Sequence, residues 1–225
     1  MNKLIFVIVL TLMAMSVASA QAQFYKGFGI KAGTSIANMD YTYPTTAIVD
    51  NEYRTRNNKI GLTIGIFKEI KLIENLKAQI GINYSRKGNT LELKELDGFG
   101  NRTGNTFNNY HNFNFFTAEL YSKYNFIKTK INPYILAGLR MDFYISQEIT
   151  SSAGNMQLEF LTPDPVTNNK IFGASIGAGI EFPATKEFSL FLEGTYNPDF
   201  TYITDGDNGF KIRGRSFDIR AGIKF

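Results

Sequence analysis

The sequence predicts an all-β fold: an eight-stranded antiparallel up-and-down transmembrane β-barrel, preceded by a cleavable signal peptide. Eight segments alternate between apolar residues and polar residues or glycine, as strands with two different faces do. The connections between these segments alternate between long and short. After Ala22 no window approaches the ~20 apolar residues of a membrane helix, although 44% of the chain is hydrophobic. A closed barrel satisfies every backbone polar group inside lipid without any helix.

The first 22 residues have the layout of a secretory signal peptide. A short basic start is followed by an apolar run over residues 4–15, which is too short to span a bilayer comfortably. Small-residue frames then predict cleavage after Ala20 or after Ala22, and the barrel domain is assigned to residues 23–225. The chain has no cysteine, which excludes lipoprotein anchoring and disulfides.

Four predicted strands lie in the first half of the chain, and each has one apolar face opposite a polar or glycine-rich face. They cover residues 28–36, 60–67, 77–85 and 116–126. In the first, Phe28 and Ile30 alternate with Gly29 and Lys31. The charged residues on the polar faces of these four strands are Lys31, Lys77, Glu119 and Lys123.

Four more strands with the same alternation follow in the second half. They cover residues 134–145, 172–182, 188–197 and 217–225. Their polar faces carry the charged residues Arg140, Asp142, Glu181, Glu193, Asp218, Arg220 and Lys224. An even number of strands brings both ends of the barrel to the same side of the membrane.

The connections predict the orientation of the barrel. The long ones lie near residues 37–58, 86–115, 146–170 and 198–211, and the short ones near 68–75, 127–132 and 183–187. Membrane barrels of this type have short periplasmic turns and long external loops. We therefore expect both termini to be periplasmic.

The glycine-rich polar face is predicted to point inward. The interior of an eight-stranded barrel is crowded, so glycine fits there while large Ile, Leu and Phe side chains face lipid. Aromatic residues near the strand ends suit the two membrane interfaces. A soluble barrel of the lipocalin type is the structural alternative. In the membrane form, the six inward cations and five inward anions should pair and plug the lumen.

The short turn between the fourth and fifth strands predicts a register. It places Asn125 beside Tyr134 and Glu119 beside Arg140 on the inward face. Opposite residues on one face of an antiparallel pair lie close enough for a carboxylate to meet a guanidinium. We therefore predict a lumenal ion pair between Glu119 and Arg140, with Asp142 as the acceptor if the register slips by two.

The last predicted strand resembles the terminal strand of outer-membrane β-barrels. The residues that carry this resemblance are Phe217, Ile219, Ala221, Ile223 and Phe225. In that family a final Phe, with apolar residues at alternate positions before it, is the mark read by the barrel-assembly machinery. The resemblance implies insertion by this machinery into the outer membrane of a Gram-negative bacterium.

A second resemblance covers nearly the whole chain after the signal segment. Residues 29–33 and 84–88, together with the last strand, resemble the PorT-like family of small outer-membrane β-barrels, within the OmpA/OmpX-like group. Residues 118–121 depart from the family, which often has a proline after an acidic residue there. PorT itself resembles a component of a protein-secretion system, so an accessory role in secretion is one alternative function.

The favoured function is a structural role, or binding and adhesion through the long external loops. These loops are rich in aromatic and amide side chains, which form adaptable contact surfaces. The expected partners are outer-membrane lipid, lipopolysaccharide and an external ligand, with Arg86 and Lys87 meeting lipopolysaccharide phosphates. No basic run with interleaved aromatics suggests nucleic acid.

A lipid A-modifying enzyme is the other alternative, and it would need the single histidine, His111, near the external rim. His111 has no adjoining serine to complete a nucleophile–base set, so a solvated loop histidine is the favoured interpretation. The segment Asp205–Gly209 has acidic residues spaced as in calcium loops but lacks the distal acid, and suits a hairpin turn. We predict no catalytic residue, metal or cofactor.

Overall fold

The computed structural model describes residues 27–43, 54–96, 99, 102–127, 130–151, 166–206 and 209–225. The predicted signal segment, residues 1–22, lies outside the described residues, as do Asp207 and Asn208 of the candidate calcium loop. In the described part, no helix is long and apolar enough to cross a membrane.

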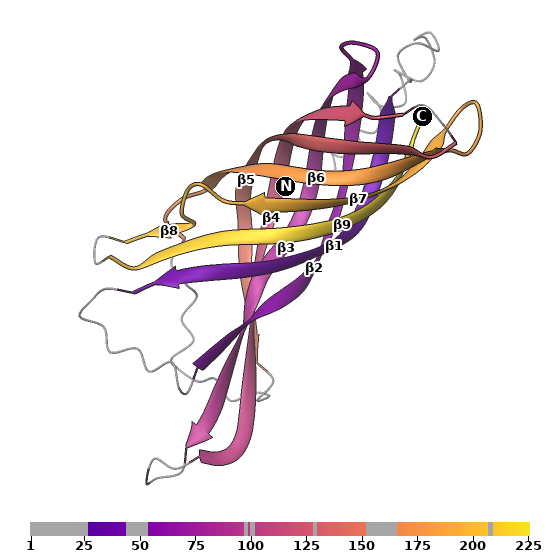
Figure 1. Cartoon of the computed structure of the whole chain (residues 1–225). Helices are drawn as coiled ribbons and strands as arrows, with labels where there is room; N and C mark the ends of the chain where they lie inside the picture. Colours follow the sequence, from indigo (N-terminus) through magenta and orange to yellow (C-terminus); the bar gives the residue numbers. More distant parts are fainter. Residues whose placement is uncertain are drawn as a thin grey trace, which may run out of the picture.

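The described strands form one closed antiparallel ring (Figure 1). The strands are β1 (Phe28–Thr42), β2 (Arg54–Lys71), β3 (Leu76–Leu96), β4 (Arg102–Asn125), β5 (Asn132–Ser151), β6 (Lys170–Pro183), β7 (Ser189–Pro198), β8 (Thr204–Asp205) and β9 (Lys211–Lys224). Each long strand pairs with the next, and β1 pairs with β9 to close the ring. The two-residue β8 pairs only with β9. The predicted fold class is confirmed.

The short connections and both described ends lie on one side of the ring. Residues 72–75, 126–127, 130–131 and 184–188 lie there, between successive strands. The backbone nitrogen of Gly27 donates to the Phe225 carbonyl, and the Phe225 nitrogen donates to the Phe28 carbonyl over 2.7 Å. We call this the turn side and the opposite end the loop side.

The strands on the loop side are longer than the sequence predicts. The predicted loop over residues 86–115 is mostly strand, because β3 continues to Leu96 and β4 begins at Arg102. Figure 1 shows these two strands projecting beyond the others as a ribbon. We call residues 92–108 the β3–β4 arm. The apolar face that marks a membrane strand is missing here, so the prediction ended the strands too early.

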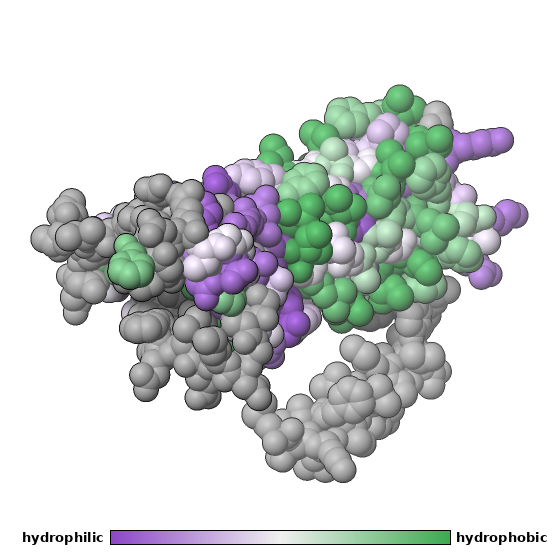
Figure 2. All heavy atoms as spheres, turned by 90° about the horizontal axis from the view of Figure 1, so that it is seen from below, coloured by the Kyte–Doolittle hydropathy of each residue, from purple (hydrophilic) through white to green (hydrophobic). Residues whose placement is uncertain are grey.

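The outer surface of the ring is apolar and the inner face is polar. Large apolar side chains are exposed on the outside, among them Ile30, Leu62, Ile64, Ile80, Leu120, Leu139, Ile176, Leu192 and Ile219. On the face that Figure 2 shows, hydrophobic residues form a green band with hydrophilic residues at both ends. The predicted register between β4 and β5 is also confirmed, with Asn125 opposite Tyr134 and Glu119 opposite Arg140.

Inward glycines allow adjacent strands and side chains to approach closely. A Cβ on Gly33 would lie 1.9 Å from the Ile219 carbonyl oxygen, and one on Gly138 would lie 2.0 Å from that of Leu120. No side chain fits at such distances, so these positions need glycine.

The barrel interior as the candidate functional site

The interior holds charged side chains of both signs. The described inward cations are Lys31, Lys77, Lys87, Lys123, Arg140, Arg220 and Lys224, and the inward anions are Glu69, Glu119, Asp142, Glu181, Glu193, Asp199 and Asp218. All eleven charged residues proposed from the sequence are in this set: nine are buried, while Lys77 and Lys224 are partly buried. The remaining three, Glu69, Lys87 and Asp199, were not proposed as lumenal charges.

The turn-side cluster consists of Glu69, Lys77, Lys123, Glu181 and Lys224. The Lys123 ammonium lies 2.6 Å from Glu69 Oε1 and 2.9 Å from Glu181 Oε2. Lys77 and Lys224 each lie 3.1 Å from Glu69 Oε2, and Lys224 also pairs with Glu181. Two carboxylates from β2 and β6 are thus bridged by three amines from β3, β4 and β9.

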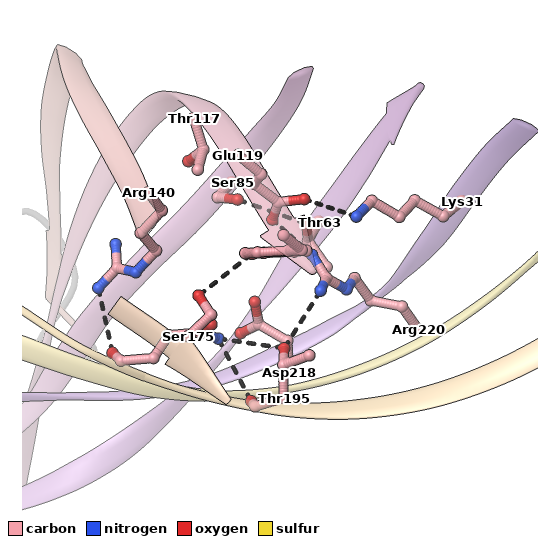
Figure 3. Close-up of polar contacts among 12 residues, drawn as sticks. Lys31, Thr63, Ser85, Thr117, Glu119, Arg140, Ser175, Thr195, Asp218 and Arg220 are labelled. Carbon is pink, nitrogen blue, oxygen red and sulfur yellow. Dashed lines mark hydrogen bonds and ion pairs between the residues drawn. The ribbon is translucent and has the colours of Figure 1, made fainter. Parts of the chain in front are cut away.

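The central cluster joins β1, β4, β7 and β9 across the bore. Lys31 Nζ lies 2.6 Å from Glu119 Oε2, and Arg220 Nη1 donates to Glu119 Oε1 over 2.7 Å. Arg220 Nε lies 3.0 Å from Glu193 Oε1, and the Tyr134 hydroxyl donates to the other Glu193 oxygen over 3.1 Å. Figure 3 shows Lys31 and Arg220 directed toward Glu119.

The loop-side cluster consists of Lys87, Arg140, Asp142 and Asp199. Lys87 Nζ lies 2.5 Å from Asp142 Oδ2, and the Thr117 hydroxyl donates to Asp142 Oδ1 over 2.8 Å. The Arg140 guanidinium pairs with both Asp142 and Asp199. Every charge in this cluster therefore has an opposite charge in contact with it.

The predicted ion pair between Glu119 and Arg140 is wrong, although the register that suggested it is right. Glu119 turns across the bore to Lys31 and Arg220, which occupy both of its oxygens. Arg140 extends along its own strand to Asp142. In a narrow bore, long side chains reach partners on distant strands as easily as the residue opposite them. Strand register alone therefore does not determine which inward charged side chains form ion pairs.

Asp218 and the two cations predicted to contact lipopolysaccharide, Arg86 and Lys87, have partners that the sequence does not predict. Asp218 accepts a hydrogen bond from the Ser35 hydroxyl over 2.6 Å. Arg86 faces outward and pairs with Glu148 over 2.7 Å. Lys87 is buried against Asp142, so its predicted contact with external phosphates is wrong. The two neighbouring cations point to opposite faces because they are adjacent in a strand.

An apolar layer lies inside the ring on the loop side of the ion clusters. Its members are Met39, Phe113, Phe115, Ile171, Ile203 and Ile212, each at most 2% exposed. Ile203 comes from the connection between β7 and β9, which folds inward and donates from its nitrogen to the Ile212 carbonyl over 2.8 Å. Nothing in the alternation of the strands indicates that this connection enters the barrel.

The unpredicted charges follow a signal that was present in the sequence. Glu69, Lys87 and Asp199 each stand two residues after an inward residue at the end of a predicted strand. Because side chains alternate along a strand, extending each predicted strand by two residues places all three side chains inside the barrel.

The single histidine is not in a solvated loop. His111 lies within β4 and is 5% exposed, so that expectation is wrong. Across the described ranges, no three His, Cys, Asp or Glu side chains are grouped to hold a metal ion. In the candidate calcium segment, Asp205 Oδ1 lies 3.0 Å from Lys211 Nζ.

The residues proposed as the insertion signal lie along β9 and at its end. Phe217, Ile219 and Phe225 are exposed on the outer surface, and Ala221 and Ile223 share their outward phase. This placement is compatible with contact to lipid, and the role in assembly stays a prediction.

The family model described as outer membrane protein beta-barrel domain matches residues 7–225. Among solved structures, Neisserial surface protein A is 15% identical over 89% of this chain and 98% of its own, with a TM-score of 0.45. The outer membrane protein OprG from Pseudomonas aeruginosa is 11% identical over 89% and 97%, with a TM-score of 0.49. Ail of Yersinia pestis, solved with the heparin analogue sucrose octasulfate, is 13% identical over 89% and 99%, with a TM-score of 0.35. No curated protein matches the sequence.

Proposed function

We propose a non-catalytic role in binding or adhesion. The chain belongs to the outer membrane protein β-barrel domain family, and the proposal starts from this membership. The protein is an integral β-barrel of the outer membrane of a Gram-negative bacterium. In this proposal the turn side, with both termini, faces the periplasm, and the loop side faces the exterior. The lumen is closed, and the external end makes the contacts.

The paired interior charges support a closed lumen. Among the described residues, cations and anions of the three clusters share the bore. An isolated buried charge would cost roughly several kcal/mol, so opposite charges stabilise one another there. An eight-stranded barrel leaves room only for side chains. The apolar layer adds a second obstacle to ions on the external side.

Planar-bilayer recording tests this closure. The purified barrel should give no stable large conductance, because side chains fill the interior of a barrel of this size. Stable large openings from the folded protein would contradict the closed lumen and would favour a general pore.

The β3–β4 arm is the single observation that carries the binding role. β3 and β4 have 21 and 24 residues, whereas roughly 9–11 residues suffice for a strand to cross a membrane. The additional length lies on the loop side, and Phe99 near the tip is 93% exposed. A strand-paired ribbon holds its tip away from the membrane more rigidly than a loop would, which suits contact with an external partner.

Trimming the arm tests the binding role. Leu91 and Asn109 are directly opposite each other, so an Asn-Gly turn can join them in place of residues 92–108. At equal surface amounts, cells with the trimmed barrel should adhere less to protein-coated surfaces and to neighbouring cells. The matched control is Lys186→Ala in an exposed turn on the other side. Equal adhesion by trimmed, control and unaltered barrels would overturn the binding role.

The finer assignments rest on the sequence resemblances. Residues 29–33 and 84–88 support a PorT-like member of the family, which keeps a secretion-system accessory as the alternative. The outward apolar residues of β9 support recognition by the barrel-assembly machinery, and residues 1–22 support export through a cleaved signal. Co-purification of secretion components from crosslinked outer membranes would favour the accessory role over adhesion.

A further inference from the structure

Three lysines stand side by side at the turn-side end of the bore. Lys71 of β2 is directly opposite Lys77 of β3, and Lys77 is directly opposite Lys123 of β4. Lys77 and Lys123 belong to the turn-side cluster, and Lys71 stands at its rim, one inward position beyond Glu69. Like charges directly opposite each other on one face of a sheet are destabilising. A row of this kind therefore needs anions between its members.

A carboxylate fills one of the two gaps in this row. Glu69 Oε2 lies 3.1 Å from Lys77 Nζ, and Glu69 Oε1 lies 2.6 Å from Lys123 Nζ. Glu69 therefore bridges Lys77 and Lys123. Among the described residues, no carboxylate bridges Lys71 and Lys77 in the same way. The gap between these two lysines is the one that lacks an anion.

The charges at this end of the bore are not balanced. The turn-side cluster and Lys71 together place four ammonium groups, among the described residues, against the two carboxylates of Glu69 and Glu181. An unmatched charge inside a bore is more costly than one on an open surface. Lys71 is exposed and the side chain of Lys77 is 23% exposed, so an anion from the turn side can reach them.

A buried amide without a partner lies beside the same gap. Gln79 is the next inward residue of β3 after Lys77, ~7 Å deeper in the bore, and it is directly opposite Glu69. Gln79 is 2% exposed, and among the described residues its amide nitrogen has no hydrogen-bond partner. A buried donor costs free energy until an acceptor reaches it. The unmatched cations and the unused donor both favour a ligand that brings acceptor oxygens and a negative charge.

Two aromatic rings limit how deep a ligand can enter from the turn side. The rings of Phe67 and Phe191 are buried and meet edge to face, with 5.4 Å between their centroids. They lie between the turn-side and central clusters, since Lys123 Nζ is 6.0 Å from the centroid of Phe191 and Lys31 Nζ is 5.7 Å from that of Phe67. Only the end of a ligand can therefore enter this mouth.

We propose that the gap between Lys71 and Lys77 is a binding site for a carboxylate group presented from the turn side. One ligand oxygen lies between the two ammonium groups, as Glu69 lies between Lys77 and Lys123, and the other oxygen accepts a hydrogen bond from the Gln79 amide. A carboxylate has the size and charge of the group that already fills the neighbouring gap. That the turn side faces the periplasm rests on the orientation proposed above, whereas the site itself does not depend on the β3–β4 arm.

Titration of the purified full-length protein with N-acetyl-trialanine, followed by NMR, tests the site. This peptide ends in a carboxylate, and its C-terminal amide is a neutral twin. The acid should shift the Gln79 side-chain signals to saturation, and the amide should bind about tenfold more weakly or worse, because a charge-assisted hydrogen bond is lost. Lys77→Gln should raise the Kd of the acid about tenfold, and it leaves Glu69 paired with Lys123. The matched control, Lys186→Gln in an exposed turn at the same end, should leave the Kd unchanged.

The comparison of acid and amide uses the unaltered barrel, so it decides the matter even where Lys77→Gln folds poorly. Equal binding of the two peptides, unchanged Gln79 signals, or equal weakening by Lys186→Gln would each overturn the proposal. Inorganic phosphate that binds more tightly than the acid would overturn the assignment to a carboxylate.

Sedimentation with isolated peptidoglycan separates two sources of the carboxylate. If untreated peptidoglycan carries the protein down and peptidoglycan with amidated carboxylates does not, the ligand belongs to the cell wall. If neither carries it down while the peptide acid still binds, the ligand is a soluble acid. Adhesion of cells with the trimmed barrel measures the arm separately, so this site can fail while the proposed binding role stands.

Discussion

The membrane-spanning wall and the β3–β4 arm are built from the same strands but follow different rules. In the wall, lipid favours apolar residues at outward positions, so the alternation is regular with few exceptions, such as Ser122, and most inward charges are buried. In the arm, water surrounds both faces, and polar residues such as Thr103 and Asn105 are exposed along β4. Strand pairing and exposed side-chain hydrogen bonds hold the arm, whereas buried ion clusters and an apolar belt add to strand pairing in the wall. Changes in the wall should therefore cost much more than changes in the arm.

The largest difference should come from deleting one aromatic residue in each region. Deleting Phe225 should prevent assembly, because it removes the proposed insertion signal and shortens β9's outward apolar face. Deleting Phe99 near the tip of the arm should leave assembly intact. Heat-modified mobility and surface protease digestion measure both. Normal surface-exposed, heat-modifiable barrel from the Phe225 deletion would remove the insertion role.

Buried and exposed cations should differ nearly as clearly. Arg220→Met removes one of the two cations that Glu119 and Glu193 share, the other being Lys31. Breaking a buried pair in this way costs ~3–5 kcal/mol. The matched change in an exposed pair, Arg86→Met beside Glu148, should cost ~0–1 kcal/mol. Urea unfolding in lipid vesicles measures both free energies. Equal losses would mean that the interior ion pairs are as well solvated as surface ones.

The same contrast explains how much the sequence reveals. In the wall, the lipid requirement makes the strands and their inward charges visible, so Lys31 and Arg220 were placed correctly inside. Beyond the apolar belt on the loop side that requirement ends, and the sequence therefore predicts a loop where His111 and its neighbours form a strand. The partners of Glu119 could not be predicted, because side chains that cross the bore depend on the closed ring. The burial of Ile203 could not be predicted, because a connection that folds inward does not alternate apolar and polar residues as a strand does.

The smallest expected effect lies at the tip of the arm and depends on pH. Hydrogen bonds from Thr103 and Asn105 lower the pKa of the exposed Glu95 carboxyl. A carboxyl with a lowered pKa in the folded state stabilises that state above its ordinary pKa, and the contribution disappears as pH falls through the folded value. NMR signals of Thr103 and Asn105 should therefore shift with a midpoint below the ordinary glutamate pKa. In the control variant Glu95→Gln, this pH-dependent shift should vanish. A midpoint at or above the ordinary glutamate pKa would show that these hydrogen bonds do not lower the pKa of Glu95.

In the proposed function, the wall encloses a lumen closed to solutes while the arm is open to water. Because the chain has no cysteine, single-cysteine variants report accessibility without background. Ser175→Cys places a thiol inside the wall, where Ser175 is 3% exposed and accepts a hydrogen bond from Tyr121 over 3.1 Å. Thr106→Cys places one on the exposed part of the arm. With a charged, membrane-impermeant thiosulfonate and barrels in vesicles, Thr106→Cys should react rapidly, while Ser175→Cys should react slower by orders of magnitude from either side. Comparable rates at the two positions would contradict a closed lumen.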